Sequence, residues 1–556
     1  MKKVVLLAIN SKYVHSALSV WILKESLRKF SLYELDCRVV ESTIQQSCDE
    51  IANDVAAEIP DIVGISAYIW NSGAISDIIR KLRERLPKLV IILGGPEALI
   101  GTEYWESRGA DYVLTGEGEF LLPGLIDGLI SSAAAVKEKN EGHFEELFPQ
   151  NAKNTKNTIN TKSSEEPLNP YTDEYFEALG NKIAYIETSR GCPFSCAFCL
   201  SGDDDVRFFP NKIAKDRILK LSKSKARTIK FVDRTFNCRP ERAYELFEFV
   251  INLDTDNRFH FEVAADLFDE KTINLLKKAP PGRIQFESGI QSFCEPALEA
   301  VSRKTDLKKT EENLKKLILG KNIHIHVDLI AGLPFESYEE FQRSFNRAFA
   351  IGAHTLQLGF LKMLHGSELR QMAANMDMTF SQKPPYEILC SEWLRGGDIE
   401  CLNVAENALR HTYNRSRFLQ TLEYALSVSN MTPFSLFMQI GKSAPNHGIQ
   451  LENYAERIFE VISCLHGVDK EILCDKMTCD WLGMVKGKNM PKFMKRGFLA
   501  HNRAVEIAKK MMKLDIQRSE YALLSTKKIV FTDNKERDPV TSLYKLHYVD
   551  YDSVVW

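Results

Sequence analysis

The chain has 556 residues, of which 44% are hydrophobic and 26% charged, and its formal net charge is −3. This length indicates roughly three domains of about 100–200 residues each, and the composition is that of a folded globular protein. The near-neutral charge gives no electrostatic reason to bind nucleic acid. The basic start Met1-Lys2-Lys3 leads into an apolar run that stops at Asn10, well short of the ~20 residues that span a bilayer. We therefore expect a cytoplasmic protein without a membrane partner.

Residues 1–134 alternate between strand-like and helix-like stretches, which predicts a doubly wound parallel α/β sheet. Strands are expected at 4–9, 36–41, 62–67, 89–93 and 112–114, and helices at 18–30, 48–59 and 75–86. Ligands of such sheets bind at the carboxyl ends of the strands. Those ends carry residues 10–15, Ser66, Gly94-Gly95 and 116–119.

Residues 135–178 are rich in Lys, Glu, Asn, Ser and Thr and are expected to form a polar, partly mobile linker. Residues 179–370 then predict a partial (β/α)6 barrel, whose reactive centre would lie at the carboxyl ends of its strands. The six strands are expected at 184–188, 228–232, 259–264, 283–287, 324–330 and 355–361. Residues 371–556 predict a mostly helical C-terminal domain, with helices at 404–425 and 454–465 and a few strands after residue 528.

The most informative motif holds Cys192, Cys196 and Cys199 in one loop after the first barrel strand. Three thiolates with these spacings can bind one face of a 4Fe-4S cubane, and the fourth iron then stays open for a substrate or cofactor. The alternative is a zinc site, which usually has four protein ligands. No fourth candidate lies close by in the sequence, since the next cysteine is Cys238.

Several positions in or just after the expected barrel strands carry polar side chains, although apolar side chains would be expected there if these positions only formed a core. They are Asp233, Thr235, Glu262, Asp266, Glu287, Gln291, Ser292 and Asp328. A buried carboxylate is costly unless it meets a ligand or a partner. The alternative to a ligand site is a set of structural ion pairs with Arg283, Arg303 or Lys304.

The cysteine motif resembles the signature of radical S-adenosylmethionine (SAM) enzymes. The resemblance implies a 4Fe-4S cluster on Cys192, Cys196 and Cys199 whose open iron binds the methionine end of SAM, with Phe198 beside it. Reduction by a flavodoxin- or ferredoxin-type donor would release a 5′-deoxyadenosyl radical. The protein positions and shields these cofactors, which carry the chemistry themselves.

The barrel pattern resembles the branch that includes oxygen-independent coproporphyrinogen oxidases. By this resemblance Glu262 and Arg303 would hold the methionine end of SAM, and Gln291 and Asp328 would hold the ribose. Glu287 is expected beside the same cofactor. Carboxylates suit a ribose diol or an ammonium, and arginine suits a carboxylate.

A doubly wound domain ahead of such a barrel resembles the cobalamin-binding subclass. The resemblance places cobalamin against a set of strand-end residues: Ser66, Gly94, Gly95, Gly116, Glu117 and Gly118. The motif Asp-x-His-x-x-Gly is absent, so we expect His15 to be a hydrogen-bonding residue at a helix start rather than a cobalt ligand. A nucleotide-binding Rossmann unit is the rival interpretation, but the first strand lacks a following G-x-G-x-x-G turn.

Together these features predict a cobalamin-dependent radical SAM enzyme that methylates an unactivated carbon. The alternatives are a radical rearrangement or cyclisation with cobalamin as redox partner, thiomethylation of tRNA, and a non-catalytic iron–sulfur sensor. The C-terminal part looks like a family-specific domain of unknown function. Its polar segment 410–417 either contacts substrate or caps a helix. The substrate and the catalytic residues stay open.

Overall fold

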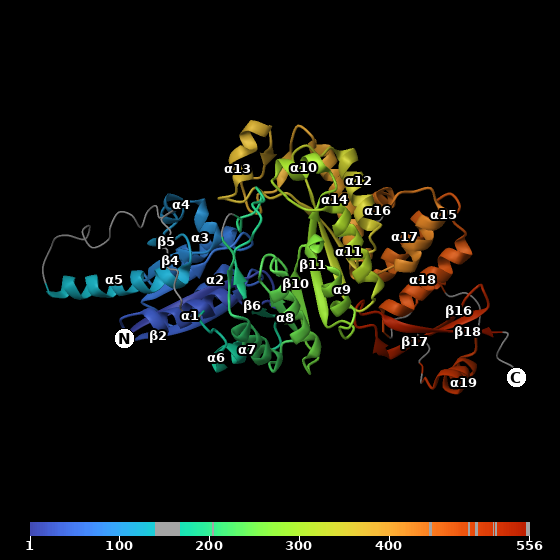
Figure 1. Cartoon of the computed structure of the whole chain (residues 1–556), viewed down its shortest axis with the longest axis horizontal. Coiled ribbons are helices and arrows are strands. Elements are labelled where there is room, and N and C mark those ends of the chain that lie inside the picture. The colour runs from blue at the N-terminus through green and yellow to red at the C-terminus, as the bar shows by residue number, and fades with distance from the viewer. Residues whose placement is uncertain are drawn as a thin grey trace.

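The computed structural model describes residues 1–138, 167–202, 205–443, 448–486, 490–494, 499–514, 516 and 520–551. The N-terminal α/β part, the central barrel and the C-terminal part follow one another along the long axis of the molecule (Figure 1). Of the expected linker, residues 139–166 lie outside the described residues. Both of its ends are helical rather than extended, in α5 (Gly118–Glu138) and α6 (Asp173–Leu179).

The N-terminal sheet has the strand order β2-β1-β3-β4-β5, and all of its strand pairs are parallel. Its elements are β1 Lys2–Asn10, α1 Leu18–Phe30, β2 Leu35–Thr43, α2 Cys48–Ala57, β3 Ile62–Ser66, α3 Ser72–Arg85, β4 Val90–Gly94, α4 Thr102–Glu106 and β5 Tyr112–Leu114. Successive side chains of β1 enter different cores: Val4 and Leu6 on the side of α1, Val5 and Leu7 on the side of α2 and α3. Both faces of the sheet are covered, which confirms the doubly wound fold.

The central sheet has the strand order β13-β12-β11-β10-β9-β6, again wholly parallel. The strands are β6 Ala184–Ile186, β9 Thr228–Phe231, β10 Arg258–Glu262, β11 Ile284–Gln291, β12 His324–Ala331 and β13 Thr355–Phe360. The helices between them are α7 Asn211–Ser222, α8 Pro240–Asn252, α9 Glu270–Leu276, α10 Glu295–Ala300, α11 Leu307–Leu319 and α12 Tyr338–Phe349. Because neighbouring strands are consecutive in this series and β6 does not pair with β13, the sheet is the expected six-stranded partial barrel.

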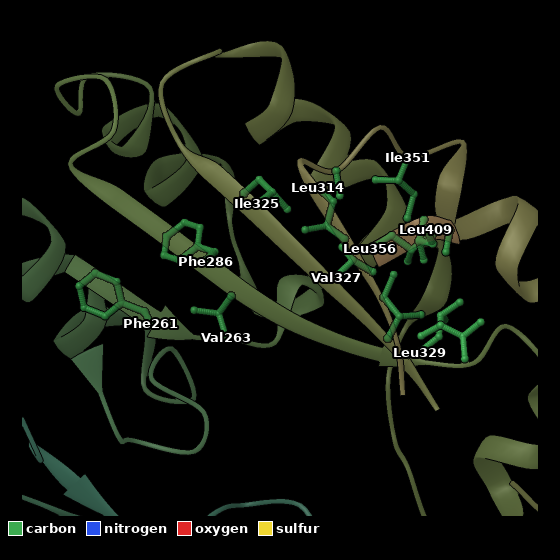
Figure 2. Packing of buried hydrophobic residues seen from close by; sticks show 14 of the residues in the cluster. Phe261, Val263, Phe286, Leu314, Ile325, Val327, Leu329, Ile351, Leu356 and Leu409 are labelled. Carbon is green, nitrogen blue, oxygen red and sulfur yellow. The ribbon is translucent and has the colours of Figure 1, made fainter. Parts of the chain in front are cut away.

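One face of the barrel sheet is apolar and the other is polar. On β12, Ile325, Val327 and Leu329 are buried on the side of the sheet that faces the helices, in the same hydrophobic cluster as Leu314 of α11 (Figure 2). The alternate positions of the same strand are His324, His326 and Asp328. Because side chains alternate between the two faces of a strand, these polar residues face the inside of the barrel.

The C-terminal part is mostly helical, as expected, and ends in a small antiparallel sheet of order β16-β17-β18. Its elements are α13 Glu368–Met372, β14 Thr379–Phe380, β15 Ile388–Cys390, α14 Gly396–His411, α15 Leu419–Val428, α16 Pro433–Ser443, α17 Leu451–Ser463, α18 Lys470–Met484, α19 His501–Met512, β16 Tyr521–Leu523, β17 Lys528–Arg537 and β18 Tyr544–Asp550. Among the described residues, no helix is both long and apolar enough to cross a membrane.

The single helix expected at 404–425 is wrong, because the chain breaks between α14 and α15. Ser416 and Phe418 adopt left-handed backbone conformations with φ of 51° and 56°. The break places Asn414 in contact with the barrel strand β13. The Asn414 amide accepts a hydrogen bond from Leu356 N at 2.9 Å and donates one to Leu356 O at 2.8 Å, so it satisfies the open edge of β13 as a neighbouring strand would.

Replacing Asn414 by Ala should loosen this edge. The Leu356 backbone groups would lose their protein partner, at a cost of roughly 1–3 kcal/mol. Amide hydrogen exchange should become faster on β13 while β11 exchanges as before, and Asn274→Ala on the exposed side of α9 should change neither strand. Equal protection of β13 in the Asn414→Ala and Asn274→Ala proteins would contradict this role.

Candidate functional site

The loop with the three cysteines leaves the carboxyl end of β6 and is closed at its base by a short antiparallel ribbon, β7 (Ser189–Arg190) with β8 (Arg207–Phe208). Gly191 has φ of 96°, a left-handed conformation that glycine adopts at little cost. The loop is pinned at Ala197, whose N–H donates to Val301 O at 3.0 Å and whose carbonyl accepts from Leu369 N at 2.8 Å. The cysteine loop is therefore held against both the barrel and the C-terminal part.

The three thiols have polar groups around them that suit thiolates. Arg303 Nη1 lies 3.8 Å from Cys196 Sγ, Ser201 N donates to Cys199 Sγ at 3.4 Å, and Thr235 Oγ1 is 3.5 Å from Cys192 Sγ. Burial raises the pKa of the Cys196 thiol, the Arg303 guanidinium lowers it, and the neighbouring thiols Cys199 and Cys192 raise it. The three thiols are therefore close enough to affect one another's ionisation, and the positive charge of Arg303 lies beside them.

The spacing of the sulfurs argues against a zinc ion. Two ligand sulfurs of one zinc can lie at most about 4.6 Å apart, since each Zn–S bond is about 2.3 Å. Among the described residues, the only set of three metal-ligand atoms that lie within 4.8 Å of one another is that of Glu287, His326 and Asp328. The sulfurs of Cys192, Cys196 and Cys199 therefore do not all lie within 4.8 Å of one another.

The inner face of the barrel carries a charged network below the cysteine loop. Glu287 Oε2 accepts from His260 Nε2 at 2.9 Å and from Lys230 Nζ at 3.1 Å, and Lys230 also lies 3.5 Å from Glu262. Burial opposes ionisation of Glu287, but the His260 hydrogen bond and the Lys230 charge hold its pKa well below the usual range. Burial raises the pKa of Glu262, and Lys230 lowers it only in part.

Asp328 continues this network on β12. His326 Nε2 lies 3.0 Å from Asp328 Oδ1, yet both atoms are buried without a hydrogen-bond partner among the described residues, because their mutual geometry is not that of a hydrogen bond. Burial lowers the pKa of His326, but the neighbouring carboxylates of Asp328 and Glu287 raise it by more, so the net shift of the His326 pKa is upward. Asp328 Oδ1 thus meets His326 as a close charge partner but retains hydrogen-bonding capacity that a polar ligand can use.

Gln291 and Arg303 stand at the end of β11, where the strand is irregular. The register shifts between Gly289 and Gln291, and Gln291 adopts φ of 71°, an unusual conformation that often marks a functional position. Arg303 donates to Gly289 O at 2.8 Å. Gln291 Oε1 and Arg303 Nε are both buried without a partner in the described part of the chain, so each retains capacity for a ligand.

The strand ends of the N-terminal sheet form the second half of the site. Gly95 has φ of 103°, and a Cβ at this position would approach Ala67 O to 2.6 Å, so the fold itself requires glycine there. A Cβ on Gly94 would meet no atom closer than 3.7 Å. Gly116 is left-handed with φ of 117°. Ser66 ends β3, and Gly118 begins α5.

Arg190 joins the two halves of the site. Its guanidinium contacts Glu187 at 2.8 Å, Glu117 at 3.1 Å and Glu119, and Glu117 also contacts Arg207. Burial lowers the pKa of Arg190, but the three carboxylates raise it well above its usual value. Since Glu117 and Glu119 follow β5 and Arg190 precedes Cys192, this cluster, the Arg190 joint, fastens an N-terminal strand end to the cysteine loop.

Two further contacts join the N-terminal domain to other parts of the chain. The Tyr386 hydroxyl donates to Glu97 Oε2 at 2.8 Å in a buried hydrogen bond, and His15 Nδ1 lies 2.6 Å from the Tyr185 hydroxyl. His15 is thus a hydrogen-bonding residue, as expected, but its partner lies in the barrel and not in α1, whose N-cap Ala17 has no side-chain cap.

Sequence reasoning missed several residues of the site. Lys230, His260 and His326 lie on the polar face of the barrel, and their alternation with apolar residues along β9, β10 and β12 is the signal that could have found them. Tyr68 and Trp70 follow β3 and stack with ring centroids 4.4 Å apart. Nothing in the local pattern distinguishes this pair from core aromatics.

The comparisons with known proteins agree with this division of the chain. Residues 4–126 match the B12 binding domain, residues 186–348 the radical SAM superfamily, and residues 374–536 a protein of unknown function, DUF4080. The cobalamin-dependent radical SAM methyltransferase TokK of Streptomyces tokunonensis is 24% identical over 321 residues, which cover 53% of this chain and 46% of TokK. The chain thus spans about half the length of that relative.

Solved structures show the same fold. The cobalamin-dependent SAM radical enzyme OxsB with aqua-cobalamin and SAM bound has a TM-score of 0.55 at 15% identity, covering 86% of this chain and 78% of OxsB. The radical SAM methyltransferase TsrM of Kitasatospora setae has a TM-score of 0.52 at 17% identity, covering 69% of this chain and 80% of TsrM.

The cysteine loop on a six-stranded partial barrel thus defines a radical SAM protein. The chain thus combines, in this order, a B12-binding domain, a radical SAM domain that carries the cysteine loop, and a DUF4080 region.

A buried carboxyl beside Gln291 gives the site a pH-dependent stability. Glu336 accepts from Ser292 Oγ at 2.5 Å and from Ser344 Oγ at 2.8 Å. Burial raises the pKa of Glu336 from 4.5 to about 7, and the two hydroxyl donors only partly offset it. Between these two values the folded chain retains a proton that the unfolded chain has released, so stability falls as the pH rises through this window.

Glu336→Gln removes the titrating group and should flatten this dependence. For each pH unit in the window, the wild type should lose about 1.4 kcal/mol of unfolding free energy that the variant does not lose. Melting temperatures measured between pH 5 and pH 8 give the comparison, and Glu339→Gln on the exposed side of α12 should retain the wild-type slope. A Glu336→Gln protein with the wild-type pH slope would overturn the assignment.

Proposed function

We propose that this protein is a cobalamin-dependent radical SAM methyltransferase that methylates an unactivated carbon. The observation that carries the proposal is the apposition of two strand-end faces across the Arg190 joint, one with three clustered thiols and the other with the glycine loops of a B12-binding domain. Enzymes that transfer a methyl group with these two cofactors need both held against one substrate. When bound, the cofactors supply radical hydrogen abstraction and a transferable methyl group.

The residues present fit a cluster and SAM. Cys192, Cys196 and Cys199 would hold a 4Fe-4S cluster and leave one iron open, and Arg303 places a positive charge beside Cys196. We further propose that a second set of residues lines the SAM site: Phe198, Glu262, Glu287, Gln291, Arg303 and Asp328. The unpartnered atoms of Gln291, Arg303 and Asp328 support this, because a polar ligand would satisfy them.

Each of these side chains has a definite task under this proposal. Asp328 and Gln291 would orient a ribose by accepting and donating hydrogen bonds, and Glu262 would accept from an ammonium group. Glu287 keeps Lys230 and His260 fixed, which sets the charge of the barrel interior. Arg303, which already bridges Gly289 and Cys196, would orient a carboxylate next to the cluster.

For cobalamin we propose Ser66, Gly94, Gly95, Gly116, Glu117 and Gly118 as the residues nearest the ligand, in a domain bounded by residues 1 and 134. Gly94 and Gly95 present backbone without side chains, which lets a large flat ligand approach. His15 is already bonded to Tyr185, which supports a cobalt without a histidine ligand from this position. Glu117 would act through the Arg190 joint as well as beside the ligand.

The remaining boundaries and partners belong to the same proposal: a linker at 135–178, a barrel at 179–370, a C-terminal domain at 371–556, and a flavodoxin- or ferredoxin-type electron donor. A reducing, cytoplasmic setting is supported by the twelve cysteines, all of them free thiols. The rearrangement, tRNA thiomethylation and sensor alternatives gain no specific support from the geometry.

The first test is the metal. Anaerobically reconstituted protein should bind one 4Fe-4S cluster and, after reduction, cleave SAM to 5′-deoxyadenosine. Cys192→Ala, Cys196→Ala and Cys199→Ala should each abolish both properties, because three ligands are the minimum for this site. Iron and sulfide analysis with electron paramagnetic resonance reports the cluster. Cys238→Ala and Cys294→Ala serve as controls, and loss of the cluster in either of them would refute the ligand assignment.

The second test is cobalamin. Gly95 is unsuitable for it, since even a Cβ there overlaps Ala67. Gly94→Leu is the better change, because the fold has room for its Cβ while a longer side chain would extend into the proposed ligand space. It should abolish cobalamin binding, measured by absorbance after gel filtration, and leave the cluster intact. As a control, Gly124→Leu, in an open position on α5, should bind cobalamin as the wild type does. Full cobalamin binding by Gly94→Leu would show that the proposed site is wrong.

A further inference from the structure

A cavity extends from the barrel to the DUF4080 region. It has a volume of about 660 Å3, within the range of about 300–1,000 Å3 typical of small-molecule sites. Its inner end is lined by Phe198, Gln291 and Asp328, and its outer end by residues of the C-terminal part. The cavity is therefore longer than the ligand site expected from the barrel alone.

Helix α14 forms the outer wall with one of its faces. Asn403, Glu406 and Arg410 line the cavity, and their spacing of three and four residues places them on one side of a helix. Leu402 and Leu409, on another side, are buried; Leu409 packs with Leu356 of β13 (Figure 2). The apolar side fixes the helix against the barrel and thereby directs its polar side into the cavity.

The contacts that follow α14 hold this wall in place. Asn414 pairs with both backbone groups of Leu356, and the Tyr413 hydroxyl donates to Ala353 O. Of the polar segment 410–417, Tyr413 and Asn414 thus have a structural task, whereas Arg410 faces the cavity.

The rim of the cavity carries neighbouring charges of both signs. Arg410 Nε lies 3.3 Å from Glu406 Oε1. Lys362 and Glu387 face each other across an isolated antiparallel bridge, which puts their side chains on the same side, and both line the cavity. Neither Lys362 nor Glu387 forms an ion pair within the part of the chain that the structure describes.

These charges select among ligand classes. A polyanion such as a nucleic acid would meet Glu387 and Glu406 along with the two cations. A neutral lipid would remove four charged groups from water without replacing their hydrogen bonds, which is costly. A small molecule with one carboxylate and one ammonium can satisfy a cation and an anion of the rim together, while its hydrocarbon body contacts Ile330, Phe360 and Leu364, which are partly exposed and line the cavity.

We infer that helix α14 of the DUF4080 region is the substrate-recognition wall and that the substrate is a small zwitterion of the α-amino acid type. Its carboxylate would pair with Arg410 and its ammonium with Glu387. The inference rests on the proposed function, because that function places SAM at the inner end of the cavity and so leaves the outer end for the substrate.

The test measures binding to the full chain, reconstituted with its cluster and supplied with SAM but not reduced, by calorimetry. The probes are the free L-amino acids, each compared with its methyl ester, which lacks the carboxylate, and its N-acetyl derivative, which lacks the ammonium. At least one amino acid should bind, and both of its derivatives should bind about ten-fold more weakly or worse, since each loses a charged hydrogen bond.

Variants connect each charge to its partner. Arg410→Ala should remove the preference for the amino acid over its methyl ester, and Glu387→Gln should remove the preference over the N-acetyl derivative, as expected for directly coupled groups. Arg415→Ala is the matched control, since Arg415 is exposed outside the cavity and should leave both preferences unchanged.

Three results would overturn the inference: no amino acid binds, the derivatives bind as well as the parent, or Arg415→Ala has the effect of Arg410→Ala. Cleavage of SAM by the reduced wild type separates this failure from that of the proposed function. Cleavage without amino acid binding refutes only the zwitterion site. Amino acid binding with the expected preferences but without cleavage supports the site and refutes the reaction class.

Discussion

Arg190 is the residue on which the arrangement of the candidate site depends. It lies two residues before Cys192 at the base of the cysteine loop and forms ion pairs with Glu117 and Glu119 of the N-terminal domain. An isolated surface ion pair contributes little, but this guanidinium is shared among three carboxylates and is only 28% exposed. Removal of the arginine would leave those carboxylates crowded and unpaired. The joint therefore fixes the distance between the cysteine loop and the glycine loops, which neither domain determines alone.

The inner face of the barrel sheet, next to this joint, is polar rather than apolar. Parallel sheets usually bury apolar side chains on both faces, yet here β10, β11 and β12 turn His260, Glu262, Glu287, His326 and Asp328 inward. Two of their atoms, His326 Nε2 and Asp328 Oδ1, have no hydrogen-bond partner among the described residues. A fold retains such groups where a ligand completes them, and the same cavity continues outward to α14, so one continuous space connects the cysteine loop, the barrel interior and the C-terminal part.

The sequence predicted the regular elements well because their cause is local. The helix at 18–30 agrees residue for residue, since its apolar positions follow the helical period, and both parallel sheets follow from strand–helix alternation. The break at 412–418 could not be predicted, because Asn414 leaves the helix for a hydrogen bond to Leu356, which lies 58 positions earlier in the chain.

The residues of the candidate site also fall into those that the sequence could suggest and those that only the structure shows. The cysteines could be proposed from their motif, and Gln291, Arg303 and Asp328 from the resemblance to a known branch; all of these assignments stay predictions. The partners of Glu117 and His15 were not found, because contacts between domains leave no periodic signal. Gly95 was selected as a cobalamin contact, which stays a prediction. The structure gives a separate reason for glycine at this position, the close approach of the Ala67 carbonyl, which only the folded chain reveals.

The central claim is that the Arg190 joint holds a cluster and a cobalamin against one another. Electron paramagnetic resonance of the protein loaded with cob(II)alamin and a reduced 4Fe-4S cluster tests it directly, because two nearby spins broaden each other's signals. We expect a broadened cob(II)alamin signal in the wild type and a sharper one in Arg190→Gln with both cofactors still bound. A cob(II)alamin signal that is unaffected by the reduced cluster in the wild type would contradict it.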